Sequence, residues 1–112
     1  ILALAEKAQE LVEKARSKKL ALDDLSGGTF TISSLGNIGG TGFTPIINAP
    51  EVAILGVGKS VIQPIWQRGA FEPRLQLPLS LSYDHRVING VDGGNFIATL
   101  TALLADIRRL AL

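Results

Sequence analysis

One short polar run in the chain could do chemistry. Residues 83–90 read Tyr-Asp-His-Arg-Val-Ile-Asn-Gly, and they contain the single histidine of the 112 residues, His85. A neutral imidazole is the usual general base near neutral pH, so proton transfer is the chemistry that this run would support. A lone histidine is nevertheless more often a packed or surface residue than a catalyst. The residues by themselves leave both interpretations open.

The overall composition limits what else the chain can bind. Eleven lysines and arginines against ten aspartates and glutamates give a net charge of +1, which provides no broad field for attracting nucleic acid or an anionic membrane. The absence of cysteine excludes disulfides and thiolate metal sites, and a single histidine argues against a zinc site. No stretch approaches the about 20 apolar residues of a membrane span, so we expect one soluble domain without a metal.

Known nucleotide-binding and hydrolase motifs do not occur in complete form, and a glycine-rich run allows two interpretations. Residues 53–60, Ala-Ile-Leu-Gly-Val-Gly-Lys-Ser, approximate a phosphate-binding loop, but Ala53 replaces its first glycine and Pro64 opposes the helix that must follow. No serine has glycines at both positions of the G-x-S-x-G hydrolase motif. The glycine-rich run at 36–42 would suit an anion-binding nest, and it would equally suit a loop whose glycines only allow positive φ.

The elements that must position His85 can be predicted from hydrophobic periodicity. Apolar residues at helical spacing indicate amphipathic helices over residues 4–15 and from Phe96 to the C-terminus. A continuous apolar run at 51–59 is typical of a strand buried on both faces. The other expected elements are a short helical turn within 17–28, a strand at 29–33, an irregular loop at 35–50, a hairpin turning at Arg68–Gly69 and a strand ending near Asp84. This order of helix, strands and helix predicts an α+β fold.

A family resemblance is carried by three separated motifs. They are SLSYDHRVINGVDGGNF at 80–96, GGTFTISSLGNIGGTGFTPIINAPEVAILGVGK at 27–59, and the terminal LLADIRRL. Their order resembles that in the catalytic domains of the dihydrolipoamide acyltransferases, the core components of 2-oxo acid dehydrogenase complexes. The resemblance covers the chain from about Ala15 onward, and it is strongest to the bacterial pyruvate dehydrogenase type.

The resemblance implies a fold and an assembly. It implies a chloramphenicol acetyltransferase-like sandwich, a mixed sheet with flanking helices, of which residues 1–112 would be the C-terminal portion of one catalytic domain that is incomplete at its N-terminal side. It also implies a homotrimer that assembles into a larger cage and works with a lipoyl domain and the other components of the complex. The implied location is the bacterial cytoplasm, with no nucleic acid and no membrane as a partner.

The resemblance also assigns site residues. The family signature H-R-x-x-D-G, preceded by Asp, makes His85 the catalytic base, and this chain has Asn89 where the signature has its second Asp. The family serine falls on Ser33, whose hydroxyl would stabilise an oxyanion, and a slip of one residue would move that role to Ser34. Asn89 would hold the local structure by hydrogen bonds, or it would be simply a turn residue before Gly90.

The implied reaction transfers an acetyl group between S-acetyl-dihydrolipoamide and coenzyme A, which take part as substrates, with no metal. Asp84 and Arg86 are expected to support the structure rather than the chemistry. A second hypothesis makes the chain a non-catalytic assembly fragment of the same core. We expect residues 1–112 alone to be inactive, because the family's domain is about twice as long by the resemblance. We also expect the strand at 51–59 to present an unpaired edge that recruits another chain.

Overall fold

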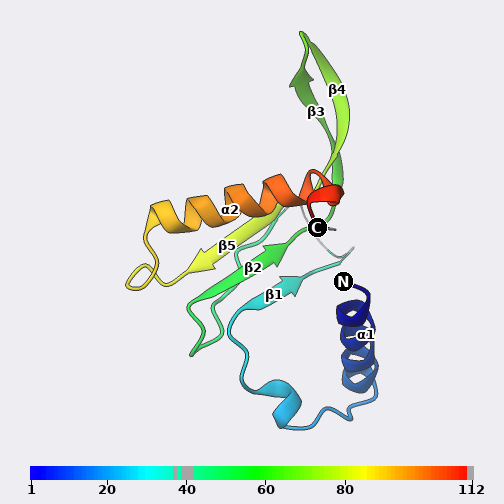
Figure 1. The fold of residues 1–112 in the computed structure, drawn as a ribbon, viewed down its shortest axis with the longest axis vertical. Helices are drawn as coiled ribbons and strands as arrows, with labels where there is room; N and C mark the ends of the chain where they lie inside the picture. The colour runs from blue at the N-terminus through cyan, green and yellow to red at the C-terminus, as the bar shows by residue number, and fades with distance from the viewer. Residues whose placement is uncertain (37, 39–41, 111–112) are drawn as a thin grey trace.

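Helices flank a central group of strands in the computed structural model, which describes residues 1–36, 38 and 42–110 (Figure 1). Helix α1, Leu2–Arg16, is followed by a 3₁₀ turn, η1, at Asp23–Leu25, and the strands come next. Helix α2, Gly90–Leu104, and a second 3₁₀ turn, η2, at Ile107–Leu110, follow the strands. The predicted α+β class and the helical turn between residues 17 and 28 are confirmed.

Three strands form the main sheet, in the order β1-β2-β5. Strand β1, Thr31–Ser34, runs parallel to β2, Ala53–Val57, and β2 runs antiparallel to β5, Leu79–Tyr83. The buried hydrophobic residues of the described chain, Ala53, Ile54 and Leu55, all belong to β2. A strand that is buried on both faces has a continuous apolar sequence, which is why this element could be predicted.

The expectation that the run at 51–59 presents an unpaired edge is wrong. Strand β2 has a hydrogen-bonded neighbour on each side, so it is the middle of the sheet, and the edges are β1 and β5. One partner precedes the long loop at 35–50 and the other follows a hairpin. Pairing between such distant segments is decided by tertiary packing, which the periodicity of one segment does not contain.

The loop at 35–50 has no helix or strand in its described part, as predicted, and most of the candidate nest at 36–42 lies outside the described residues. Farther along the loop, Pro45 is buried, and both it and Phe43 pack against Gly56 of β2. A Cβ at Gly56 would lie 3.1 Å from the Phe43 ring and 3.2 Å from Pro45. The loop can cover β2 this closely because residue 56 is a glycine.

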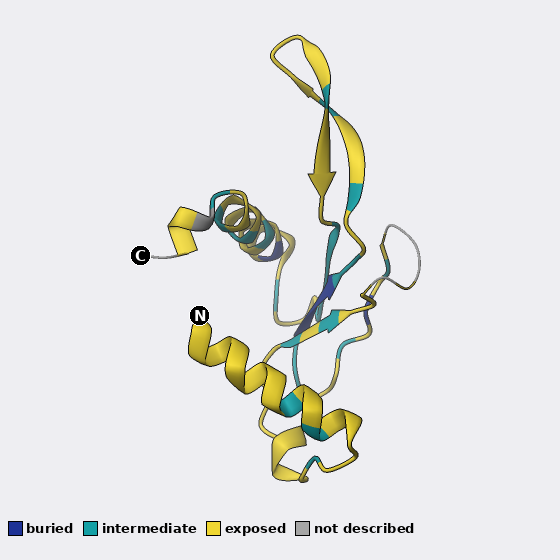
Figure 2. Cartoon of the chain, turned by 90° about the vertical axis from the view of Figure 1, so that its right-hand side faces the viewer, coloured by how far each residue is buried: buried dark blue, intermediate teal, exposed yellow. Residues whose placement is uncertain are grey.

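A two-stranded hairpin, β3 (Val61–Gln67) and β4 (Ala70–Gln76), projects away from the main sheet, and most of it is exposed (Figures 1 and 2). Its turn lies at Arg68 and Gly69, as predicted, with φ angles of 52° and 84°. Positive φ at both central residues is the feature of the type I′ turn, whose twist matches that of paired strands.

Helix α2 ends earlier than its apolar spacing predicts. The spacing from Phe96 onward predicts a helix that runs to the C-terminus, whereas α2 ends at Leu104. Just beyond this end, the Asp106 carboxylate accepts hydrogen bonds from the backbone N–H of Arg108 at 3.2 Å and from its guanidinium at 2.8 Å. Such local side-chain bonds compete with the helical backbone pattern, and the chain continues into η2.

Candidate active site

His85 lies in a tight turn between β5 and α2. The ladder with β2 extends one residue beyond β5, where the Asp84 N–H donates to the Val52 carbonyl at 2.8 Å. The N–H groups of Val87 and Ile88 then donate to the Asp84 carbonyl at 3.0 and 2.9 Å. The side chain of His85 is exposed on this turn, so a substrate can reach the imidazole without local unfolding.

Asp84 and Arg86 pair with each other on either side of the histidine. One Asp84 oxygen accepts the backbone N–H of Arg86 at 2.9 Å, and the guanidinium donates to both oxygens, most closely at 2.6 Å. The bonds from the Arg86 side chain, and then the one from its backbone, lower the pKa of Asp84 to about 2. The ion pair therefore stabilises the turn fully at pH values above the ordinary carboxyl pKa of 3.8. This stabilisation is lost as the pH falls through the lowered pKa of about 2. This geometry suits the supporting role expected for both residues.

Ser33 lies on β1, opposite Gly56 of β2. Its side chain is half-buried, whereas that of Ser34 is exposed on the other face of the strand. The Ser34 hydroxyl already accepts the backbone N–H of Gly36 at 3.1 Å, where the chain leaves the strand. The two serines thus differ in setting: Ser33 faces the half-buried side of the sheet, whereas Ser34 bonds to the exposed chain that follows the strand.

The sheet register keeps Ser33 and His85 apart within one chain. Ser33 pairs with Gly56, and Gly56 pairs with Ser80, so the serine is level with Ser80 on the far edge of the sheet. Tyr83 is three residues farther along β5 and two strands across, which places its Cα roughly 14 Å from that of Ser33. His85 lies beyond Tyr83. Groups that act on one carbonyl must each be about 3 Å from a reacting atom, so a single chain does not bring these two together.

Asn89 is the N-cap of α2. Its side-chain oxygen accepts the backbone N–H groups of Val91 and Asp92, both at 2.9 Å. These are two of the N–H groups that have no partner within the helix, and Asn is among the side chains best suited to accept them. Asn89 therefore holds the start of α2, four residues after the histidine.

Two substitutions at Asn89 should show whether the helix cap matters or the absence of a negative charge at this position. Asn89→Asp should keep both the stability and the activity of the full-length enzyme, because a carboxylate accepts the same N–H groups and suits a helix N-terminus. Asn89→Leu should lower the free energy of unfolding by about 1 kcal/mol, the usual cost of a lost cap, and should reduce activity. Thermal unfolding measures the first effect, and an assay of the acetyl transfer that the family resemblance implies measures the second. A leucine variant equal to wild type in stability and rate would contradict this role.

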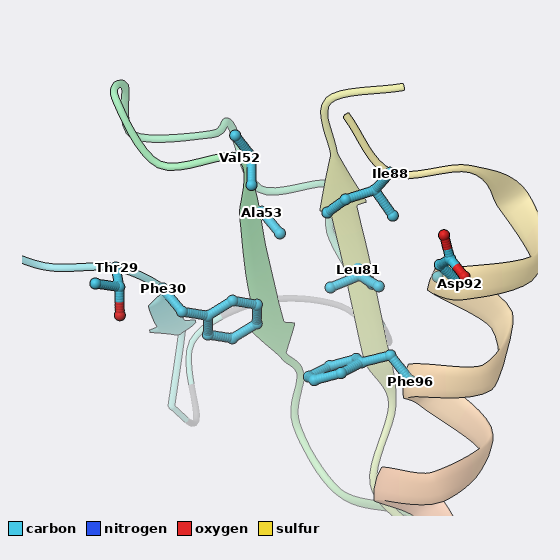
Figure 3. A pocket seen from close by; sticks show the side chains of 9 residues that line it. Thr29, Phe30, Val52, Ala53, Leu81, Ile88, Asp92 and Phe96 are labelled. Carbon is cyan, nitrogen blue, oxygen red and sulfur yellow. The ribbon is translucent and has the colours of Figure 1, made fainter. Parts of the chain in front are cut away.

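An apolar cavity of about 290 Å³ lies between the sheet and α2 (Figure 3). Phe30 and Phe96 approach each other there, with ring centroids 5.6 Å apart. The lining includes none of the three predicted site residues.

A second cavity, of about 450 Å³, is lined by Asp84 and Arg86, on either side of His85, and by residues of the segment 47–52. The periodicity of the sequence contains no signal for either cavity, because each forms between segments that are distant in the chain.

The described residues contain no group of three or more His, Cys, Asp or Glu side chains that could hold a metal ion. Among the same residues, no helix is long and apolar enough to cross a membrane.

Comparison with protein families identifies the class. The model of the 2-oxoacid dehydrogenases acyltransferase catalytic domain matches residues 1–112. The chain therefore belongs to this acyltransferase family.

Individual relatives are acetyltransferases. The chain is 64% identical to the dihydrolipoyllysine-residue acetyltransferase component of the pyruvate dehydrogenase complex of Pseudomonas aeruginosa, and 65% identical to that of Azotobacter vinelandii, each over 112 residues. The matches cover 100% of this chain and 20% and 18% of the two relatives. The chain thus spans about a fifth of the length of these relatives.

Two solved structures match with TM-scores of 0.93. One, 65% identical, concerns the role of a serine, a histidine and an asparagine in the catalytic mechanism of Azotobacter vinelandii dihydrolipoamide acetyltransferase. The other, 66% identical, is the cubic core of the pyruvate dehydrogenase multienzyme complex. Each match covers 99% of this chain and 46% of the other. The acyltransferase fold implied by the sequence motifs is confirmed.

Proposed function

We propose that residues 1–112 are the C-terminal portion of one catalytic domain of a pyruvate dehydrogenase-type acetyltransferase, which moves an acetyl group between S-acetyl-dihydrolipoamide and coenzyme A. One observation carries the proposal. In the Azotobacter vinelandii enzyme, the serine and the histidine are 52 positions apart and the histidine and the asparagine are four apart, as are Ser33, His85 and Asn89 here. Ser34 does not fit this spacing.

The residue types suit each step of a thioester exchange. The thiol of coenzyme A is mostly protonated near neutral pH, so His85 takes its proton as the sulfur bonds to the acetyl carbonyl carbon. The Ser33 hydroxyl donates a hydrogen bond to the resulting oxyanion. When the tetrahedral intermediate collapses, the carbon–sulfur bond to dihydrolipoamide breaks, and the imidazolium returns the proton to that sulfur.

The register supports a site that two chains share. Because one chain keeps Ser33 and His85 apart, we propose a homotrimer in which Ser33 of one chain meets His85 of the next. Assembly of trimers into a larger cage is supported by the solved cubic core at 66% identity. In this proposal a lipoyl domain presents the acetyl group, the other components of the complex bind around the cage, and the reaction takes place in a bacterial cytoplasm.

The hairpin carries a face that suits contact between copies. Because side chains alternate along a strand, the register gathers six apolar residues on one side, with exposed fractions of 61% for Trp66 and 69% for Phe71. This apolar face consists of Ile62, Pro64, Trp66, Phe71, Pro73 and Leu75. An isolated two-stranded hairpin is marginally stable in water, so we expect another protein surface to pack against this apolar face. The hairpin leaves the sheet at the end near Ser33, where the proposed neighbour's His85 must arrive.

A substitution on the apolar face should weaken the trimer. In the full-length enzyme, Trp66→Ser should cost about 2 kcal/mol of association free energy, about thirtyfold in the dissociation constant, as for a buried aromatic hot spot. Gln63→Ser is the matched control, since it lies on the opposite face of β3. Analytical ultracentrifugation measures both. Equal association of the two variants would show that another part of the same chain covers the face.

Acetylation of coenzyme A separates the proposed enzyme from the alternative, a non-catalytic assembly fragment of the core. The full-length protein, mixed with S-acetyl-dihydrolipoamide and coenzyme A, should form acetyl-coenzyme A, measured by its thioester absorbance or by mass spectrometry. Assembly into large particles without this product would favour the alternative.

A further inference from the structure

The candidate base needs a fixed orientation that the hydrogen bonds of its turn do not supply. Among the described residues, those bonds link Asp84 with Arg86 and close the backbone, and the imidazole of His85 takes part in none of them. A general base must present one ring nitrogen to its proton donor within hydrogen-bond distance. An exposed side chain without contacts would be distributed over several rotamers. Packing must therefore orient the ring.

Tyr83 provides a packing surface for the imidazole. The centroids of the two rings are 5.6 Å apart, and their planes are inclined by 45°. This separation lies within the range of favourable aromatic contacts. Tyr83 is the last residue of β5 and pairs with Ala53, one of the buried residues of β2. Its backbone is thus fixed by the most buried part of the sheet, whereas His85 follows in the exposed turn.

Helix α2 confines the tyrosine ring. A Cβ at Gly93 would lie 2.9 Å from Cε1 of Tyr83 and 3.2 Å from its Cζ, closer than a methyl group tolerates. Gly93 is also the buried residue of α2. The helix can therefore lie directly on the ring because residue 93 has no side chain. Asn89 contributes by fixing where α2 begins, one turn before Gly93.

We propose that Tyr83 is a positioning residue for His85, and that Gly93 fixes the tyrosine ring by letting α2 pack directly against it. The proposal rests on the role of His85 as the base in the proposed acetyl transfer. It gives α2 a part in catalysis even though its residues do not touch the reacting atoms. It predicts that substitutions at Tyr83 on β5 and at Gly93 on α2 both lower the rate, although neither residue would touch the reacting atoms.

Two substitutions at Tyr83 test the proposal in the full-length enzyme. Tyr83→Leu should lower kcat by about tenfold or more with little change in the Michaelis constants, because a misplaced catalytic group costs up to about 10²-fold. Tyr83→Phe keeps the ring and should remain within about threefold of wild type, since the ring rather than the hydroxyl contacts both Gly93 and His85. Normal kcat in the leucine variant would overturn the proposal.

A double-mutant cycle distinguishes positioning from general damage. In a His85→Ala background no imidazole remains to be oriented, so adding Tyr83→Leu should change the residual rate by less than about twofold. An equal loss in the two backgrounds would show that Tyr83 only maintains the fold and would overturn the proposal. Full activity of His85→Ala itself would instead contradict the proposed function.

Two neighbouring glycines provide a matched pair that leaves Tyr83 in place. Gly93→Ala should push the ring and lower kcat by about tenfold or more. Gly94→Ala is the control, because among the described residues a Cβ there would meet no atom within 4 Å beyond its chain neighbours and the backbone of its own helix. It should keep kcat within about twofold of wild type and preserve or raise the melting temperature, as alanine does in a helix interior. This pair decides the question if Tyr83→Leu fails to assemble, and equal rates of the two alanine variants would count against the proposal.

Discussion

Alanine in place of His85 should lower kcat of the full-length enzyme by about 10²- to 10⁴-fold, the usual cost of removing a general base. The coenzyme A thiol would then have to lose its proton to water, and only its small thiolate fraction would react. Within the described part of the chain, the exposed imidazole takes no part in the hydrogen bonds of its turn, which connect Asp84 with Arg86. The substitution should therefore leave the melting temperature and the assembly close to those of wild type.

Val87→Ala is a suitable control for this loss. Val87 lies in the same turn and is 65% exposed, so its truncation alters the turn's surface without removing a proton acceptor. Its kcat should stay within about twofold of wild type, as for most surface substitutions. A folded and assembled His85→Ala enzyme whose kcat falls by less than about threefold would show that the histidine is not the base. The proton acceptor would then have to be another group, since the enzyme would still transfer the acetyl group.

Local features of this fold could be predicted from the sequence. The apolar run of β2 predicts burial because a central strand has no solvent face, and Gly69 predicts the hairpin turn because positive φ favours glycine. The end of α2 was not predictable from apolar spacing alone. It depends on the carboxylate of Asp106, which bonds to Arg108 just after the helix. Capping by Asn89 is again local, since its side-chain oxygen bonds to N–H groups two and three residues ahead. This cap fits the expectation of local hydrogen bonding better than the alternative of a simple turn residue.

Features that depend on the meeting of distant segments could not be predicted. The sequence places Ser33 and His85 in one family pattern, but only the register shows that one chain holds them at different ends of the sheet. The same holds for the contact of Gly93 with Tyr83, which requires α2 to lie on β5. The wrong expectation of an edge at 51–59 has this cause too, since a strand's two neighbours are a property of the sheet.

Ser33→Ala should lower kcat by about 10²- to 10³-fold, the range for loss of one oxyanion donor, with the Michaelis constants for both substrates little changed. The hydroxyl acts on charge that develops only during reaction, so its removal should spare ground-state binding. Ser34→Ala is the matched control on the other face of β1, where the hydroxyl accepts the Gly36 N–H. It should affect stability slightly and kcat by less than about threefold. If only Ser34→Ala lost activity, the assignment along β1 would be off by one residue.

Mixing the two inactive variants tests whether a site is shared between chains. In a cyclic trimer, a site is intact when its serine comes from a His85→Ala chain and its histidine from a Ser33→Ala chain. Random co-assembly by co-expression would make about a quarter of all sites intact, so the mixture should recover about a quarter of the wild-type rate. The two variants assembled separately and then combined without subunit exchange should recover nothing. If each site belonged to one chain, every site in the co-expressed mixture would carry a defect, and a rate no higher than that of the single variants would contradict the shared site.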